Sequence, residues 1–178
     1  MARITLQTPE SMPELFEFLS ERRGPFGAFN IFRAMANCPD ILRAFISLAD
    51  VIRQGYGIDP VLRELAVIQT CQVLGSSYEH DRHWNIAVSL GAPKSKLENI
   101  WQFERCDNFT PLEKAVLRLA REATRAPEQV SAEIWDDVRT RLGEQQALAL
   151  LFSVGWYNLT ARISGPLDLE DEPGFARA

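Results

Sequence analysis

The sequence has 178 residues and a net charge of −5, from 24 acidic and 19 basic side chains. A chain of this length can bury its own core, and its 46% hydrophobic content is too high for a disordered protein. The acidic balance, without a block of Lys or Arg, argues against nucleic acid and against an anionic membrane surface as partners. We expect one domain over residues 1–165 and an acidic, extended tail over residues 166–178.

The N-terminus and the cysteines indicate the compartment. The first residues, MARITLQTPESMPELF, contain no apolar segment of the kind found in signal peptides. The most apolar stretch, from Ala147 to Tyr157, is too short to cross a bilayer and is interpreted as a buried helix. An odd number of widely spaced cysteines does not suggest a disulfide framework. We therefore expect a cytoplasmic protein.

Hydrophobic residues recur with helical spacing almost throughout the chain. The predicted helices, in chain order, cover residues 13–23, 30–36, 39–54, 60–74, 77–90, 94–104, 111–123, 131–142 and 144–163. Capping residues are found at the predicted N-termini of several of these helices. These residues are Ser11 with Glu14, Asp59 before Pro60, Ser76 with Glu79, and Thr110 with Glu113.

An all-α fold follows, as a bundle of antiparallel helices joined by short loops. Two helical segments, Leu62 to Leu74 and Ala147 to Tyr157, are apolar on almost every side. Such helices lie at the centre of a bundle or at a subunit interface. Because a small chain contains two of them, we expect a homo-oligomer, although a central position of each helix is the simpler explanation.

Ionisable residues interrupt the apolar faces of two consecutive helices. Glu79 and His83 lie one turn apart on the face that continues to Ala87, whereas Arg82 falls on the face expected to be solvated. Glu64 shares a face with Cys71 in the preceding helix. Since only Gly75 separates the two helices, they must fold back on or across each other, which could bring Glu64 near His83. A buried carboxylate beside a buried imidazole has the composition of an acid–base pair.

Structural explanations compete with this interpretation. Glu79 could serve only as the acid of a capping box, His83 could be a hydrogen-bonded core histidine, and Glu64 could be a structural partner of an arginine. With two histidines in the chain, metal binding by His80 and His83 is disfavoured. Cys71 is interpreted as a core residue. The run Gly155-Trp156-Tyr157-Asn158 could line a pocket, but helix packing is the favoured interpretation.

The run RELAVIQTCQVLGSSYEHDRHWNIAVSLGAP resembles the core motif of the carboxymuconolactone decarboxylase and alkylhydroperoxidase D-like superfamily. The likeness extends from about Phe29 to Ile163, and LLFSVGWYNLTARI is similar to the last helix of many members. The resemblance implies a helical fold that assembles into dimers, trimers or hexamers. It also implies an enzyme without a cofactor or metal, a lyase or isomerase acting on a small carboxylated lactone or a related acid.

The resemblance also suggests roles for single residues. Glu64 matches the glutamate of the family's proton relay and His83 matches its distal histidine. Ser76 and Glu79 occupy the positions of the two redox cysteines of the peroxidase branch, and Tyr78 that of the histidine between them. The sequence is therefore closer to the decarboxylase branch, which lacks these cysteines.

We assign Glu64, His83 and Glu79 as catalytic residues, and expect the substrate to contact four neighbouring side chains. These four are Tyr78, Ser76, His80 and Arg63. Two other functions remain open: a thiol peroxidase, which the absence of a Cys-x-x-Cys motif disfavours, and an oligomeric binding protein without catalysis.

Overall fold

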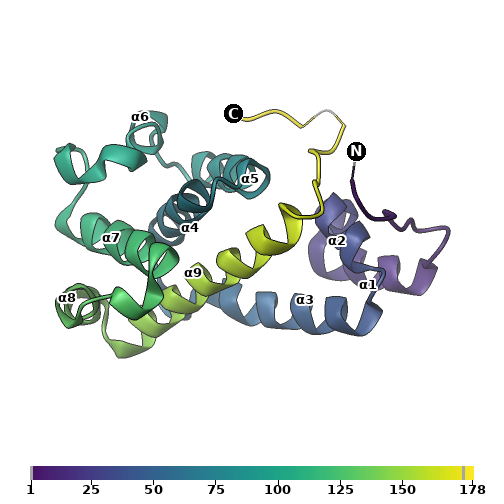
Figure 1. Ribbon diagram of the computed structural model, residues 1–178, viewed down its shortest axis with the longest axis horizontal. Coiled ribbons are helices and arrows are strands. Elements are labelled where there is room, and N and C mark those ends of the chain that lie inside the picture. The colour runs from purple at the N-terminus through teal and green to yellow at the C-terminus, as the bar shows by residue number, and fades with distance from the viewer. Residues whose placement is uncertain (1, 174) are drawn as a thin grey trace. The chain divides into compact units, whose positions relative to one another are not determined.

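The computed structural model describes residues 2–173 and 175–178, and these residues form helices and connecting turns without a β-strand. Figure 1 labels the α-helices. The all-α prediction is confirmed. None of the helices within the described ranges has the length and apolar character needed to cross a membrane. The chain divides into two compact units, Met1–Arg53 with Arg162–Ala176, and Gln54–Ala161 with Arg177–Ala178. The single domain expected over residues 1–165 stays a prediction.

The first unit contains three α-helices and a short 3-10 turn. The elements are α1 (Pro13–Arg23), η1 (Gly24–Ala28), α2 (Asn30–Met35) and α3 (Pro39–Gln54). Arg22 and Arg23 of α1 both bind Asp50 of α3. Residues 166–176 of the acidic tail also belong to this unit, where the backbone N–H of Asn30 donates to the Glu172 carboxylate at 2.7 Å. This part of the tail therefore packs on its own chain.

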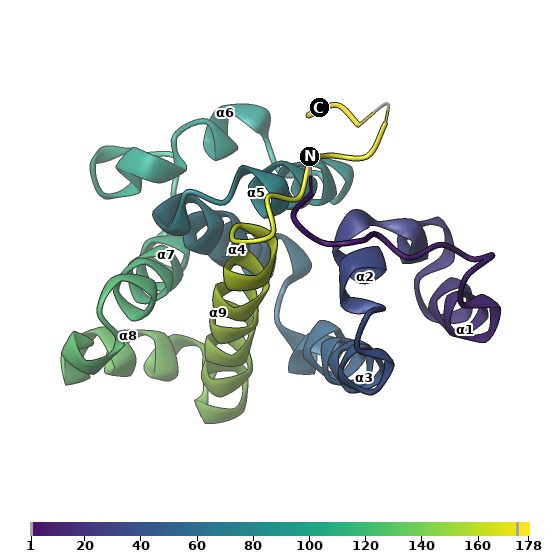
Figure 2. The same ribbon diagram turned by 45° about the vertical axis from the view of Figure 1, so that its right-hand side comes forward.

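The second unit contains the remaining helices. Its elements are η2 (Gly55–Gly57), α4 (Pro60–Leu74), α5 (Ser77–Ser89), α6 (Lys94–Leu97), η3 (Ile100–Arg105), α7 (Pro111–Arg125), η4 (Pro127–Gln129), α8 (Ala132–Leu142) and most of α9 (Glu144–Ser164). Helix α4 lies between α5 and α7 in both ribbon views (Figures 1 and 2).

The central position of α4 explains its apolar composition. From Leu62 to Cys71 every α4 side chain except Arg63 is buried. One side of the helix packs with α7, α8 and α9, and another side packs with α5 and η3. Burial of each such aliphatic side chain contributes about 1.5–3 kcal/mol to the gross stabilisation of the fold. For α4 the simpler explanation of its apolar sequence, a central helix, is sufficient.

Two of the four predicted helix N-caps are present in the structure. Asp59 accepts a hydrogen bond from the backbone of Leu62 at 2.8 Å, and Thr110 and Glu113 form a reciprocal capping box. Ser11 does not cap α1, because its hydroxyl bonds residues before the helix. Ser76 makes no side-chain cap on α5. There the predicted capping box is wrong, since Glu79 lies buried beside His83.

One predicted helix is interrupted. Residues 94–104 form α6 and then η3, and Gln102 departs from helical geometry. The Asn99 side chain donates to the Ser95 carbonyl and accepts from the Gln102 side chain. Local side-chain hydrogen bonds of this kind offer the backbone an alternative to a continuous helix.

Candidate active site

A sharp reversal between α4 and α5 brings their polar side chains together. Gly75 ends α4 with a positive φ of 66°, a conformation that glycine adopts without steric cost. The Ser76 N–H then donates to the Cys71 carbonyl at 2.9 Å, which closes the turn. The two helices fold back on each other, as the single-glycine connection predicted.

The central feature of the site is a buried hydrogen bond between α4 and α5. His83 Nδ1 lies 2.5 Å from Glu64 Oε2, and the two side chains are only 6% and 3% exposed. A carboxylate removed from water must be compensated by hydrogen bonds or an opposite charge, and the imidazole supplies this partner. The predicted proximity of Glu64 and His83 is confirmed, and their catalytic role stays a prediction.

A second carboxylate lies near the other imidazole nitrogen. Glu79 Oε2 is 4.0 Å from His83 Nε2, within ion-pair distance but too far for a direct hydrogen bond. Glu79 is 5% exposed. His83 therefore lies between two buried carboxylates, one hydrogen-bonded to Nδ1 and the other close to Nε2.

Arg63 contacts the Glu64 oxygen that His83 leaves available. Its Nη2 and Nε atoms lie 3.2 and 3.4 Å from Glu64 Oε1. Burial disfavours the charged form of Glu64, but the charge and hydrogen bond of His83, together with those of Arg63, outweigh it and lower the pKa of Glu64. Glu64 is consequently held as a carboxylate. Arg63, which we expected to contact the substrate, contacts Glu64; its contact with a substrate stays a prediction.

Helix α9 contributes an aromatic ring to the site. The ring of Tyr157 packs edge-on against the His83 imidazole, with centroids 4.3 Å apart and planes at 74°. Such a contact restricts the rotation of the imidazole about its side-chain bonds. The site assignment from sequence missed Tyr157, although the run Gly155 to Asn158 had been noted as helix packing.

Tyr78 lies within a buried stack at the start of α5. The Arg82 guanidinium lies 3.5 Å from the centroid of the Tyr78 ring, and its Nη1 donates to the Tyr78 carbonyl at 2.5 Å. Arg82 is 6% exposed, so the expectation that it is solvated was wrong. Its planar, weakly hydrated guanidinium can be buried by stacking on an aromatic ring.

The two remaining candidates have other surroundings. His80 Nδ1 lies 2.8 Å from the Asp81 carboxylate, and its ring centroid is 6.0 Å from that of Trp84. Ser76 is half-buried at the N-terminus of α5. The contact of either residue with a substrate stays a prediction. Within the described part of the chain, no group of three or more His, Cys, Asp or Glu side chains could hold a metal ion.

The sequence model of the Carboxymuconolactone decarboxylase family matches residues 39–122, a segment that contains both Glu64 and His83. The chain is also 27% identical over 127 residues to the uncharacterized protein YdfG of Bacillus subtilis strain 168, which covers 71% of this chain and 86% of YdfG. These matches support the carboxymuconolactone decarboxylase and alkylhydroperoxidase D-like superfamily as the family that this chain resembles.

Solved structures of other proteins have a similar fold. The debrominase Bmp8 aligns with a TM-score of 0.84 and 19% identity, over 96% of this chain and 92% of Bmp8. An alkylhydroperoxidase AhpD core protein from Ralstonia eutropha JMP134, a peroxidase-related protein, aligns with a TM-score of 0.83 and 18% identity, over 97% and 93% of the two chains. At these identities the likeness concerns the fold alone.

The buried cysteine of the chain, Cys71, is in surroundings that do not favour thiol chemistry. Burial raises the pKa of the Cys71 thiol well above its ordinary value, and the charges of Glu79 and Glu64 raise it further. Only the thiolate is a strong nucleophile, so Cys71 is held in its unreactive form. All three cysteines are free. The interpretation of Cys71 as a buried core residue is confirmed.

Two surface hollows lie away from the Glu64–His83 pair. The larger, of about 800 Å³, is lined mostly by charged side chains of α8 together with Arg118 of α7. The smaller, of about 460 Å³, is formed by residues of α1 and η1 in the first unit. Neither is lined by Glu64, Glu79 or His83, whose side chains are enclosed by protein.

Proposed function

We propose that the protein is a cofactor-independent acid–base catalyst, a lyase or isomerase acting on a small carboxylated lactone or a related acid. The observation that carries the proposal is the buried hydrogen bond between His83 Nδ1 and Glu64 Oε2, with Glu79 close to Nε2. A buried titratable pair of this kind is typical of sites that transfer protons. Resemblance to the superfamily supports the class of reaction.

Glu64 has a defined part in this proposal. As a carboxylate it accepts a hydrogen bond from Nδ1–H of His83 and fixes the tautomer in which Nε2 is available to a substrate. Its negative charge also stabilises the imidazolium that forms whenever Nε2 takes up a proton. Arg63 and Tyr157 hold Glu64 and His83 in position from either side.

The proton transfer can be written with its electrons balanced. In a decarboxylation the bond between the α-carbon and the carboxylate carbon breaks, carbon dioxide leaves, and the electron pair stays on the α-carbon as an enolate. Protonated His83 gives its Nε2 proton to this carbon, becomes neutral and is then reprotonated by solvent. In an isomerisation, Nε2 instead removes a proton from one carbon and returns it to another.

The surroundings of Nε2 restrict the substrate. Since His83 and Glu79 are enclosed, only a small molecule can bring a carbon within reach of Nε2. Glu79 is positioned to orient such a molecule or His83 itself. We assign contacts with the rest of the substrate to Tyr78, Ser76, His80 and Arg63, which surround the start of α5 or adjoin Glu64.

Thiol peroxidase activity is the less favoured alternative. Such a cycle needs a thiolate and a second thiol within reach to resolve the oxidised sulfur. The positions of the family's redox pair hold Ser76 and Glu79, and the pKa of Cys71 is raised. A binding protein without catalysis is the other alternative, and the activity of site variants distinguishes it.

The decisive experiment uses deuterium incorporation from D2O, followed by NMR, over a panel of small carboxylated lactones and 2-oxo acids. We expect His83→Gln and Glu64→Gln each to lower turnover about 100-fold or more, and the double variant to lose little beyond either one. Circular dichroism establishes that each variant is folded. Full turnover by His83→Gln would contradict the proposal, and binding of these acids without turnover by the parent would favour the binding protein.

The proposal also holds that the chain acts as a homo-oligomer, as the apolar composition of α9 and the resemblance led us to expect. The proposed homo-oligomer does not depend on the proposed acid–base chemistry, and either can be tested without the other.

A further inference from the structure

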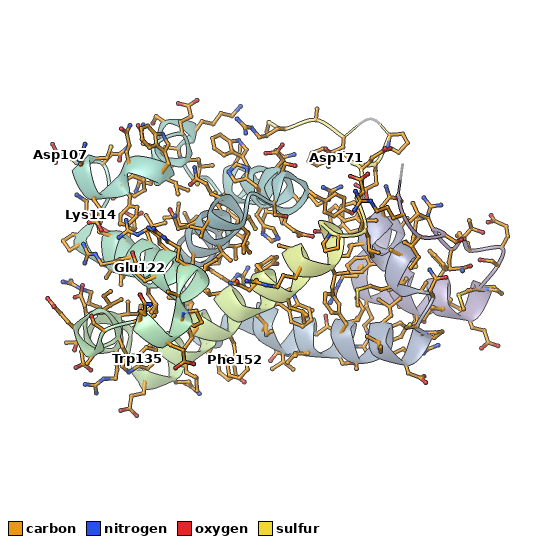
Figure 3. The ribbon with its side chains drawn as sticks, viewed as in Figure 1. Asp107, Lys114, Glu122, Trp135, Phe152 and Asp171 are labelled. Carbon is orange, nitrogen blue, oxygen red and sulfur yellow. The ribbon has the colours of Figure 1, made fainter. Side chains whose placement is uncertain are left out.

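Helix α9 exposes a row of apolar residues. Leu148, Phe152 and Leu159 are 51%, 56% and 47% exposed, and Gly155 between them is exposed as well. The opposite side of the helix is buried, with Ala147, Leu150 and Val154 in the core of the second unit. Phe152 is labelled beside α9 in Figure 3. We call Leu148, Phe152, Gly155 and Leu159 the α9 seam.

The spacing of the seam is that of a helix–helix contact. Its members are separated by four, three and four positions, the pattern that keeps one stripe of a helix facing a partner helix. The outer face of a solvated helix normally carries polar or charged residues. Here no charged residue interrupts the stripe from Leu148 to Leu159.

Gly155 gives separate support for a helix–helix contact at the α9 seam. A glycine inside a helix destabilises it relative to alanine, so it needs a structural reason. A Cβ atom built on Gly155 meets nothing within 4 Å, so no close approach inside this chain requires the glycine. Because Gly155 has no side chain, it leaves a gap in the seam next to the exposed ring of Phe152.

We propose that the α9 seam binds the α9 seam of a second copy of this chain, with the two helices antiparallel about a two-fold axis. In this arrangement Phe152 enters the gap at Gly155 of the partner subunit, and Leu148 contacts Leu159 of the partner subunit. Each contact occurs twice by symmetry, as in an isologous dimer. A large side chain facing a position without one gives the complementary packing that stable interfaces need.

The charges at the two ends of α9 favour the antiparallel orientation. Glu144 lies in the first turn and Arg162 in the last turn. Antiparallel helices place the acidic end of one beside the basic end of the other. Parallel helices would instead place like charges together and oppose Phe152 to a second Phe152, leaving the gap at Gly155 unfilled.

The surface is tested by measuring the molar mass of the full chain by sedimentation at tens of micromolar. This inference rests on the proposed homo-oligomer and is independent of the proposed chemistry. We expect the parent to be at least dimeric and Phe152→Glu to dissociate into folded monomers. Trp101→Glu is the matched control, because Trp101 is 67% exposed on η3 and outside the seam, and it should leave the mass unchanged.

Gly155→Leu tests the gap without breaking the helix. Leucine favours helix more than glycine and has open space in the single chain, so the variant should fold at least as well as the parent. By filling the gap it should raise the dimer dissociation constant at least about tenfold. Unchanged association of Gly155→Leu would overturn the assigned packing.

Disulfide trapping tests the orientation, in a background with Cys38→Ser and Cys106→Ser. A mixture of chains carrying Leu148→Cys and chains carrying Leu159→Cys should form a cross-linked heterodimer, whereas Leu148→Cys alone should not cross-link. Cross-linking of Leu148→Cys alone would overturn the antiparallel arrangement. If the Phe152→Glu variant stays dimeric, the chain self-associates but the α9 seam is not its interface. If the parent is monomeric, both the α9 interface and the homo-oligomer are refuted.

Discussion

His83 Nδ1 and Glu64 Oε2 are 2.5 Å apart, although the two residues belong to different helices and are almost completely buried. The bond joins the first half of α4 to the middle of α5, and Arg63 contacts the other Glu64 oxygen. A charged group with this little access to water depends entirely on its partners. Changes at the pair should therefore affect both stability and activity.

Glu64→Gln should destabilise the fold. The substitution keeps the size of the side chain but leaves Arg63 and His83 without their anion, and loss of one partner of a buried pair costs roughly 3–5 kcal/mol. Urea unfolding at neutral pH measures the change in the free energy of unfolding. The control is Glu98→Gln at an exposed position, expected to change stability by less than about 0.5 kcal/mol. An equal effect of the two substitutions would contradict the importance of the pair.

The same pair predicts how stability varies with pH. The pKa of Glu64 is lower in the folded than in the unfolded chain, so the unfolded chain binds the extra proton first. The stabilisation is therefore complete above the ordinary glutamate pKa of about 4.3 and is lost as the pH falls through the lower pKa of the folded state.

Other carboxylates, those of Asp50, Glu104 and Glu113, also have lowered pKa values and give acid destabilisation of the same sign. The informative quantity is the difference between the parent and Glu64→Gln. We expect the free energy of unfolding of the variant to decline less steeply below pH 5. Parallel pH profiles would show that Glu64 has the same pKa in both states.

Cysteine chemistry should be dispensable. The triple variant Cys38→Ser, Cys71→Ser, Cys106→Ser is expected to match the parent in thiol-dependent hydroperoxide turnover, with neither exceeding the background reaction. The physical reason is the raised pKa of Cys71, which keeps the buried thiol protonated. If the parent turns over peroxide and the variant does not, the redox branch of the superfamily is the better assignment.

Two helix starts that look alike in sequence should respond differently to alanine. Thr110→Ala should cost about 1 kcal/mol, because the Thr110 hydroxyl accepts from the Glu113 backbone at 3.2 Å. Ser76→Ala should change stability by less than about 0.5 kcal/mol, since Ser76 makes no side-chain cap. Thermal unfolding of both variants beside the parent measures this contrast. Equal losses would indicate that Ser76 caps α5 in solution.

These two starts also show what the sequence could predict. The helices and the closeness of Glu64 and His83 followed from local information, namely hydrophobic spacing, caps and a single-glycine turn. The same pattern at Ser76 gives no side-chain cap, and Glu79 instead lies buried with its carboxylate 4.0 Å from His83, whose position depends on tertiary structure. Pattern alone cannot say which of two partners a carboxylate will take.

The burial of Arg82 and the contact of Tyr157 with His83 were not predicted, for a related reason. Helical spacing placed Arg82 on the solvated face, but stacking on Tyr78 buries it. Tyr157 is far from His83 in the chain, and no local pattern connects α9 to α5. Contacts between distant segments are set by how the helices pack, and a single sequence carries little information about that packing.

The reversal at Gly75 has a consequence for how the protein folds. Glu64 and His83 are only 19 positions apart, and the residues that join them form one helix–turn–helix segment, Pro60–Ser89. Closing so short a loop costs little chain entropy, and contacts between near neighbours in sequence form quickly. We therefore expect the contact between Glu64 and His83 to be among the early contacts between helices when the chain folds, before the contact of His83 with Tyr157 of α9.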